Sequence, residues 1–228
     1  MVTRSLLGSL CGLAIMLVAG CVKPGQPNIP FTVTDADGNQ YGVISIGTQT
    51  WMAGNLRVTH YNDGTPILNI TDAWDWGHTG TGAWCEYDNS ATNGNVYGKL
   101  YNWYAVNTNK LAPVGWHVPT YAEWQTLEIY LGNNDSTGGR LKETGFNHWQ
   151  NPNALATNER GFTALPGGSR FSTGTFSGLT YNGYWWTSSE GLSDTAYGRY
   201  RFMDFSLGGV YGTEDYKVDG LSVRCIKD

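Results

Sequence analysis

Hydrophobic and polar residues alternate with a period of two near the start of the chain. The runs 31–34 and 41–46 are rich in β-branched residues, and a turn sequence ending at Gly38 separates them. Alternation of this kind on both sides of a short turn predicts a β-hairpin. A second turn at Gly47, followed by a further strand, is expected over 47–52.

Two stretches in the middle of the chain show the period of an α-helix. In the stretch 97–106, the positions 97, 100, 101, 104 and 105 share one helical face. The other stretch begins with a capping box, in which the side chains of Thr120 and Glu123 each accept a hydrogen bond from the other's backbone N–H. Its buried stripe and its C-terminal stop are predicted at Trp124, Leu127, Leu131 and Gly132.

The rest of the chain predicts loops and short strands. Residues 62–95 are rich in Asn, Asp, Gly and Thr and keep neither period, so we expect a long structured loop there. After Gly161, short strands separated by glycine turns are expected. The run 221–226 is predicted to be a central strand that brings Cys225 towards the loop that holds Cys85. Abundant glycine and aromatic residues with few charges favour a loop-rich fold over a helical bundle.

The first 21 residues contain one continuous apolar block and no periodic pattern. Residues 6–18 are almost wholly apolar, Arg4 supplies a positive flank, and the small residues Ala19 and Gly20 precede Cys21. The block is too short for a membrane-spanning helix, and it is typical of a bacterial lipoprotein signal peptide, which is cleaved before a lipidated Cys21. A plain secretory signal or an uncleaved anchor is the alternative.

These segments predict the domain organisation and the location of the protein. A lipoprotein signal peptide spans 1–20, the lipidated cysteine and a Pro-rich tether span 21–30, and a single domain spans 31–228. A diacylglyceryl group together with N-acylation would attach the protein durably to a membrane. We therefore expect a protein of the cell envelope, lipid-anchored to the outer membrane and either periplasmic or surface-exposed.

Charge and cysteine content narrow the choice of partners. The 14 basic and 19 acidic residues give a formal net charge of −5 without any basic run, so nucleic-acid binding is not expected.

If Cys11 leaves with the signal and Cys21 carries lipid, Cys85 and Cys225 remain. In an exported protein they are predicted to form a disulfide, which would contribute about 4–5 kcal/mol for a loop of this length. Two free thiols, one of them reactive, are the alternative.

The polar residues form no recognisable catalytic constellation. The four histidines lack the spacing of metal ligands on a helix or strand; they are His60, His78, His117 and His148. Ser169 is not part of a Gly-x-Ser-x-Gly nucleophile elbow. We therefore predict no catalytic residues and no metal ligands, and a protein that is not an enzyme.

Calcium is the one cofactor that the sequence leaves open. The run Asn-Asn-Asp at 133–135 and the cluster of Glu86, Asp88 and Asn89 supply the hard oxygen ligands that calcium prefers. Neither has EF-hand spacing, and the triplets of calcium-dependent sugar-binding lectins do not occur. A turn built from Asn and Asp residues is the alternative at both places.

The aromatic residues include the candidates for ligand contact. The chain has 10 Trp and 14 Tyr residues, whose flat faces stack on sugar rings and anchor protein interfaces. Trp74 and Trp76 lie in the acidic segment 72–77, where alternation would place both rings on one side. An exposed pair would form a binding platform, whereas a pair folded back would cover the core. Both interpretations stay open, and these two residues are the candidate ligand-binding residues.

Several longer phrases carry a family resemblance. They include Gly-Trp-His-Val-Pro-Thr at 115–120 and Gly-Phe-Thr-Ala-Leu-Pro-Gly-Gly at 161–168. The full set lies, in order, at 51–57, 97–105, 115–124, 141–142, 161–170, 184–189 and 222–228. The chain resembles the Fibrobacter succinogenes major paralogous domain family over nearly all of 31–228. The resemblance implies surface or periplasmic lipoproteins of Bacteroidetes-like bacteria and assigns no activity.

Two phrases, at 118–124 and at 167–170, are also similar to formylglycine-generating enzymes, which have a C-type-lectin-like fold. That similarity implies an α+β fold with two main helices, short irregular antiparallel strands and long loops. The enzymes need a pair of nearby cysteines near the end of the domain, and this chain has only Cys225 there. The fold is therefore expected without the chemistry.

The function that we expect is a membrane-anchored, non-catalytic binding or adhesion module. Its ligand would be a glycan or a protein at the envelope or outside the cell. An enzyme on a formylglycine-generating-like fold and a structural envelope protein are the alternatives.

Overall fold

The computed structural model describes residues 32–228, in which three sheets and one long helix surround a common aromatic interior. The predicted signal peptide, the lipidation site at Cys21 and the tether lie outside the described residues. No helix within 32–228 combines the length and apolar character needed to cross a membrane.

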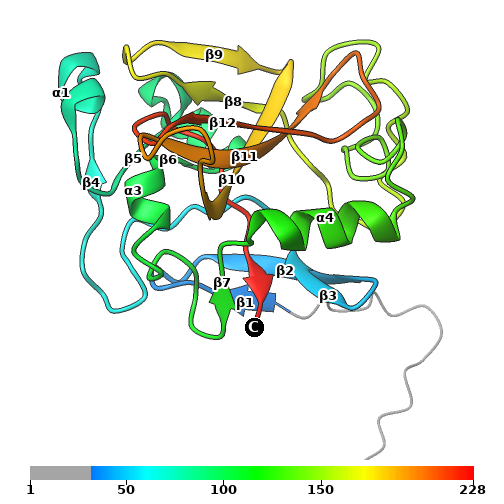
Figure 1. Cartoon of the computed structure of the whole chain (residues 1–228), viewed down its shortest axis with the longest axis horizontal. Coiled ribbons are helices and arrows are strands. Elements are labelled where there is room, and N and C mark those ends of the chain that lie inside the picture. The colour runs from blue at the N-terminus through cyan, green and yellow to red at the C-terminus, as the bar shows by residue number, and fades with distance from the viewer. Residues whose placement is uncertain (1–31) are drawn as a thin grey trace, which may run out of the picture.

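The first sheet is built from both ends of the described chain (lower part of Figure 1). Its strand order is β1 (Thr32–Thr34), β2 (Gln40–Ile46), β3 (Gln49–Met52), β13 (Ile226–Lys227) and β7 (Trp116–His117), and all neighbours are antiparallel. The predicted hairpin and the strand after Gly47 are therefore confirmed. Only the end of the predicted strand 221–226 is a strand, and it lies inside the sheet between β3 and β7.

The second sheet comes from the C-terminal half, where short strands are predicted. Its order is β12 (Tyr211–Tyr216), β11 (Tyr197–Asp204), β10 (Asn182–Glu190), β8 (Gly167–Arg170) and β9 (Phe176–Leu179). All pairs are antiparallel except β8 and β10, which meet in parallel at Gly168 and Gly183. A third, small sheet contains β4 (Leu68–Asn69), β5 (Ala83–Cys85) and β6 (Leu100–Tyr101).

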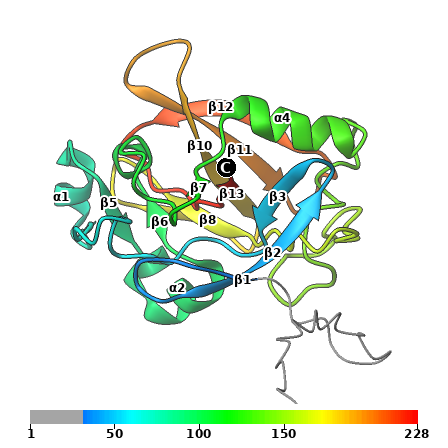
Figure 2. The ribbon, with the colours of Figure 1, turned by 90° about the horizontal axis from the view of Figure 1, so that it is seen from below.

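The longest helix, α4 (Tyr121–Tyr130), has the features that its sequence predicts. Thr120 and Glu123 form the reciprocal capping box, and the stripe residues Trp124, Leu127 and Leu131 are buried. Gly132 follows with a φ of +102°, a conformation that glycine adopts without steric cost. Figure 2 shows α4 running beside β11 and β12.

The predicted helix over 97–106 is wrong. The short helix α2 (Ala91–Tyr97) ends at Gly98, whose φ is +84°, and residues 100–101 then pair with β5 as strand β6. Only α3 (Trp103–Val106), capped by Asn102, is helical in this stretch. Of the five positions expected on one helical face, all but Tyr104 are buried, and pairing with β5 satisfies the backbone of β6 in place of a helical ladder.

The predicted long loop over 62–95 is also wrong in part. This stretch contains β4, α1 (Ala73–His78), β5, the 3-10 turn η1 (Tyr87–Asn89) and α2. The α+β class is confirmed, with sheets as the larger component. The two main helices that we expected are replaced by one long helix and several short ones.

Six tryptophans make the interior of the molecule. Those with less than 2% of their surface exposed are Trp51, Trp76, Trp124, Trp149, Trp185 and Trp186. Trp51 and Trp124 meet edge to face with ring centroids 5.1 Å apart, which joins β3 to α4. Trp124 also meets Trp185 of β10 with ring centroids 6.1 Å apart, which packs the first half of α4 against the second sheet.

Candidate functional site

The short helix α1 places the two tryptophans of the predicted pair in different environments. Asp72 caps this helix by accepting hydrogen bonds from the backbone N–H groups of Trp74 and Asp75. Residues two apart on a helix point to different sides, so the alternation expected for an extended loop does not apply. Trp76 is 0% exposed, whereas Trp74 is 70% exposed and stacks on His78 at 3.6 Å. Trp76 is therefore part of the core, and only Trp74 is available for contact.

Cys85 and Cys225 are both free and buried, so the predicted disulfide is not formed. Cys85 packs in a cluster with Trp76 and Leu100, whereas Cys225 packs in a different cluster with Val223. The strand that ends the chain leads to the first sheet and not to the Cys85 loop. Burial raises the pKa of Cys85 to about 12 and places that of Cys225 higher still, so both thiols are protonated at neutral pH.

Three of the four histidines, His60, His117 and His148, pair with carboxylates, whereas His78 lies against Trp74. His117 lies between Asp228, at 2.6 Å, and Glu123, at 2.9 Å. Burial lowers the pKa of His117, but the hydrogen bonds to these two carboxylates outweigh it and raise the pKa overall. Within residues 32–228, no three His, Cys, Asp or Glu side chains lie close enough together to hold a metal ion.

The two oxygen-rich clusters considered for calcium differ in structure. In the first, Glu86 pairs with Lys99 at 3.1 Å, and the amide of Asn89 donates to the carbonyl of Thr71. These groups therefore serve the local fold. In the second, the run 133–135 borders an open pocket.

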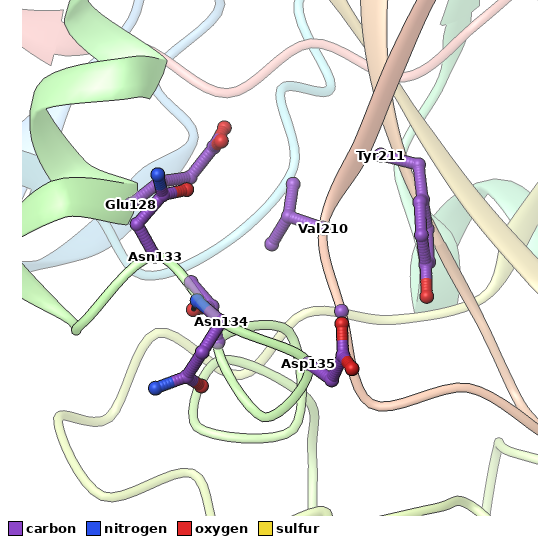
Figure 3. A pocket seen from close by; sticks show the side chains of 8 residues that line it. Glu128, Asn133, Asn134, Asp135, Val210 and Tyr211 are labelled. Atoms are coloured by element: carbon purple, nitrogen blue, oxygen red, sulfur yellow. Dashed lines mark hydrogen bonds between the residues drawn. The ribbon is translucent and has the colours of Figure 1, made fainter.

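The pocket has a volume of about 140 Å³ and lies at the C-terminal end of α4. Its lining residues come from three elements, which Figure 3 shows: the last turn of α4, the turn that follows it, and the start of β12. The polar side chains in its lining are those of Glu128, Asn133, Asn134, Asp135, Thr137 and Tyr211. It contains two carboxylates and no basic side chain.

Local backbone geometry builds one wall of this pocket. Asn133 has a φ of +45°, and its backbone N–H donates to the carbonyl of Glu128 at 2.8 Å, which turns the chain back after α4. Asn134 accepts hydrogen bonds from both the backbone and the hydroxyl of Ser136. This Asx turn fixes the turn residues without using the side chains of Asn133 or Asp135.

The opposite wall depends on a close approach between two backbones. A Cβ atom at Gly208 would lie 2.3 Å from the carbonyl oxygen of Asp135, so this position requires glycine. The absence of a side chain lets the segment before β12 come against the turn after α4. Tyr211, two residues beyond Gly209, then contributes its ring to the pocket.

The polar side chains of the pocket differ in whether they have partners within residues 32–228. Oε1 of Glu128 lies 2.9 Å from Nε of Arg201, with only 10% and 5% of these side chains exposed. Within residues 32–228 the carboxylate of Glu128 accepts no hydrogen bond in addition to this ion pair. The side chains of Asn133, Asp135 and Tyr211 likewise make no hydrogen bond within that range. Burial raises the pKa of Glu128, and the charge of Arg201 opposes the shift.

Sequence reasoning identified the Asn-Asn-Asp run but missed Glu128 and Tyr211. A signal for Glu128 exists, because it follows Trp124 by four positions and therefore falls on the predicted buried face of the helix. A carboxylate on a buried face needs an ion pair or a functional reason. Tyr211 carries no such signal, since it reaches the pocket only through the pairing of β12 with β11.

The comparisons with known proteins identify one family. A family model described as the Fibrobacter succinogenes major domain matches residues 44–227. No match was found among curated proteins or among solved structures. The matched range covers all three sheets except β1 and the first residues of β2, and it includes the pocket. The chain therefore belongs to the Fibrobacter succinogenes major domain family.

Proposed function

We propose that this protein is a non-catalytic binding module whose pocket at the end of α4 holds one sugar unit of a glycan. One observation carries the proposal: three polar side chains without hydrogen-bond partners, those of Asn133, Asp135 and Tyr211, line a single concave site beside the ion-paired Glu128. Asn133 and Asp135 are exposed and their side chains make no hydrogen bond within residues 32–228, so their polar atoms are free to bind a ligand. A ligand that supplies the missing partners accounts for the arrangement.

The chemistry of the lining favours a polyhydroxylated ligand. Carboxylates accept hydrogen bonds from hydroxyl groups, and an amide both donates and accepts, so Glu128, Asp135 and Asn133 suit neighbouring hydroxyls of a sugar. The ring of Tyr211 offers an apolar face to the C–H side of such a ring. Because the lining has two carboxylates and no basic side chain, neutral sugars and amino sugars fit, whereas acidic sugars would be repelled.

Calcium is not part of this proposal. The ion takes six to eight oxygen ligands, and the pocket offers two carboxylates, of which Glu128 is already paired with Arg201. Binding without catalysis is supported by the buried, protonated thiols of Cys85 and Cys225, which exclude thiolate chemistry at neutral pH.

The test is a binding screen of the mature chain carrying Cys21→Ser, which removes the lipid attachment site. Neutral, amino and acidic oligosaccharides are titrated by calorimetry, with calcium and again with a chelator. We expect a neutral or amino sugar to bind in both buffers and Asp135→Ala to weaken binding at least about tenfold, the loss of one charge-assisted hydrogen bond. Asp75→Ala, which removes an exposed carboxylate on α1, is the matched control and should bind normally.

Three results would count against the proposal. Binding of no sugar in the panel would remove the function, and unchanged binding by Asp135→Ala would remove the site. Loss of binding in chelator would show that a metal ion is required after all.

Trp74 supports a second contact on a different part of the surface. Its exposed ring, stacked on His78, suits adhesion to a protein or to a glycan. If it serves adhesion, Trp74→Ala will reduce attachment of the protein to whole cells or polysaccharide while leaving the sugar affinity of the pocket unchanged. Equal attachment by the variant would remove this candidate.

We also propose the location and the fold relationship that the sequence predicts. A lipid on Cys21 would place the domain on the outer membrane, and Cys21→Ser should then release the protein from the membrane fraction. A variant that stayed with the membranes would contradict lipid anchoring. The phrases at 118–124 and 167–170 support a relationship to the C-type-lectin-like fold, which an experimental structure would test by superposition.

A further inference from the structure

We propose that the ligand is a chain of several sugar units, and that the loop around Phe146 forms a second subsite for it. This inference rests on the proposed function of the pocket at the end of α4. A second hollow of about 360 Å³ lies in the loop that follows Lys142. Its lining includes Phe146, Asn147, His148, Gln150, Asn151 and Thr180.

The second hollow has the composition of a sugar-binding surface. Phe146 is 63% exposed, although it is a large apolar side chain. Within residues 32–228, the side-chain amides of Asn147, Gln150 and Asn151 make no hydrogen bond, so they are free to bind hydroxyl groups. An exposed aromatic ring beside unpaired amides matches the apolar face and the polar edge of a sugar.

The loop that carries this hollow is held rigidly. Nε1 of Trp149 donates to the carbonyl of Ala164 at 2.9 Å, and the amide of Asn153 donates to the carbonyls of Glu143 and Gly145, each at 2.8 Å. The ring of His148 is fixed by Glu143 at 2.8 Å. A preformed surface loses little conformational freedom on binding, which favours affinity.

A series of neighbouring residues leads from the first pocket to the second hollow. Next to the first pocket, Leu155 contacts Gly208, the residue that approaches Asp135. The backbone N–H of the neighbouring Ala154 donates to the carbonyl of Phe205 at 2.7 Å. Phe205 in turn meets Tyr181 edge to face at 5.2 Å.

Tyr181 follows Thr180, which lines the second hollow and accepts a hydrogen bond from the backbone N–H of Gln150 at 2.9 Å. Leu155 and Tyr181 are 60% and 46% exposed, so the connection lies at the surface. A strip of apolar groups between two polar hollows suits a polysaccharide, whose rings present C–H faces between hydroxyl edges.

The buried Lys142 contacts the segments that carry both subsites. Its side chain is fully buried, and Nζ donates to the carbonyls of Asp204 and Leu207 at 3.0 and 2.8 Å. The same ammonium group lies 5.3 Å from the ring centre of Trp149, in the loop of the second hollow. The segment before the first pocket and the loop of the second are therefore held in a fixed relation.

The test measures affinity against ligand length with the unlipidated mature chain. The probes are gluco-, manno- and chito-oligosaccharides of one to six units, titrated by calorimetry. We expect the hexamer of the bound series to bind at least about tenfold more tightly than the monomer, because additional rings stack on the strip and on Phe146. Phe146→Ala should abolish most of that gain and leave monomer affinity unchanged. Phe171→Ala, an exposed phenylalanine on another hairpin, is the matched control.

The outcomes separate this inference from the proposed function. If the monomer binds and Asp135→Ala weakens it, but affinity does not rise with length, the second subsite is refuted and the pocket stands. An unchanged gain in Phe146→Ala also refutes the second subsite. If neither monomers nor hexamers bind, both proposals fail. Thermal melting of each variant checks that the fold is intact, and all three substituted side chains are exposed.

Discussion

The buried cations and the open pocket differ in how far their polar groups are hydrogen-bonded within the protein. Arg224, which is 1% exposed, donates to Oδ1 of Asn55 at 2.9 Å and to the carbonyls of Phe162 and Thr163. Arg170, equally buried, donates to the carbonyls of Ile70, Thr71, Asp72 and Gly174. Neither has a carboxylate partner within residues 32–228. The pocket at the end of α4, in contrast, leaves the carboxylate of Asp135, an amide and a phenol without hydrogen bonds within the described residues, and pairs Glu128 with Arg201 alone.

The contrast indicates which residues serve the fold and which serve a ligand. Buried cations fasten irregular loops by pairing their carbonyls, a task that regular sheets and helices do not need. Arg170, Arg224 and Lys142 all fall within the phrases that carry the family resemblance, whereas Glu128, Asp135 and Tyr211 fall outside them. Those phrases therefore include the buried cations that fasten the loops and do not include these three residues of the pocket.

The largest expected effect separates the two tryptophans of α1. Trp76→Ala removes a fully buried side chain against which the guanidinium of Arg170 packs at 4.6 Å. We expect a loss of about 4 kcal/mol in the free energy of unfolding, from lost burial and the cavity left behind. Urea denaturation measures it. Trp74→Ala is the control and should cost less than about 0.5 kcal/mol; equal losses would show that the two rings share one environment.

Arg224→Met tests the buried cations directly. The substitution keeps an apolar stem of similar length but leaves Asn55 and the carbonyls of Phe162 and Thr163 without their donor. We expect a loss of about 3 kcal/mol in the free energy of unfolding. Arg224→Lys keeps the charge without the planar fork and should lose part of that amount. Stability within about 1 kcal/mol of the unmodified protein for Arg224→Met would contradict this role.

The pH dependence of stability tests the environment of the buried Asp219. It is 2% exposed, and burial together with the neighbouring charge of Asp215 raises its pKa from 3.8 to about 8. Between these values the folded state binds more protons than the unfolded state, so stability falls as the pH rises from about 4 to about 8. Asp219→Asn should remove that fall and stabilise the protein by about 2 kcal/mol at pH 8.

The measurement is urea denaturation of Asp219→Asn and of the unmodified protein at pH 5 and at pH 8. The variant imitates the protonated carboxyl group, so the two proteins should be closest in stability at the lower pH. Parallel pH dependences in the two proteins would mean that Asp219 does not hold its proton in the folded state.

The smallest effect is expected in the pocket. Asp135→Ala removes a side chain without a partner, so the free energy of unfolding should change by less than about 0.5 kcal/mol. The same substitution is expected to weaken sugar binding strongly, which is the reverse of the behaviour of Arg224→Met. A large loss of stability in Asp135→Ala would mean that the carboxylate belongs to the scaffold.

The sequence predicts those parts of the fold that depend on neighbouring residues. The capping box of α4, the stop at Gly132 and the first hairpin are local, and the structure confirms them. The predicted helix over 97–106 does not form because residues 100–101 pair with β5 as strand β6. The local sequence pattern does not show this pairing. Local alternation likewise could not separate Trp74 from Trp76 once Asp72 had started a helix.

The candidate site shows the same division. The Asn-Asn-Asp turn was visible in the sequence because its residues are consecutive. The pocket was not, since Gly208 and Tyr211 reach it from more than 70 positions away through a close backbone approach. The disulfide prediction rested on the number of cysteines, and that number holds no information on which core cluster each thiol enters.

The two buried thiols also bear on the conditions under which the domain folds. Since no covalent cross-link joins β5 to the C-terminal segment within the described chain, unfolding and refolding require neither a reductant nor an oxidant. Folding of the described domain therefore needs no oxidoreductase. The rate at which Cys85 and Cys225 react with a thiol reagent then reports how often the interior opens to solvent.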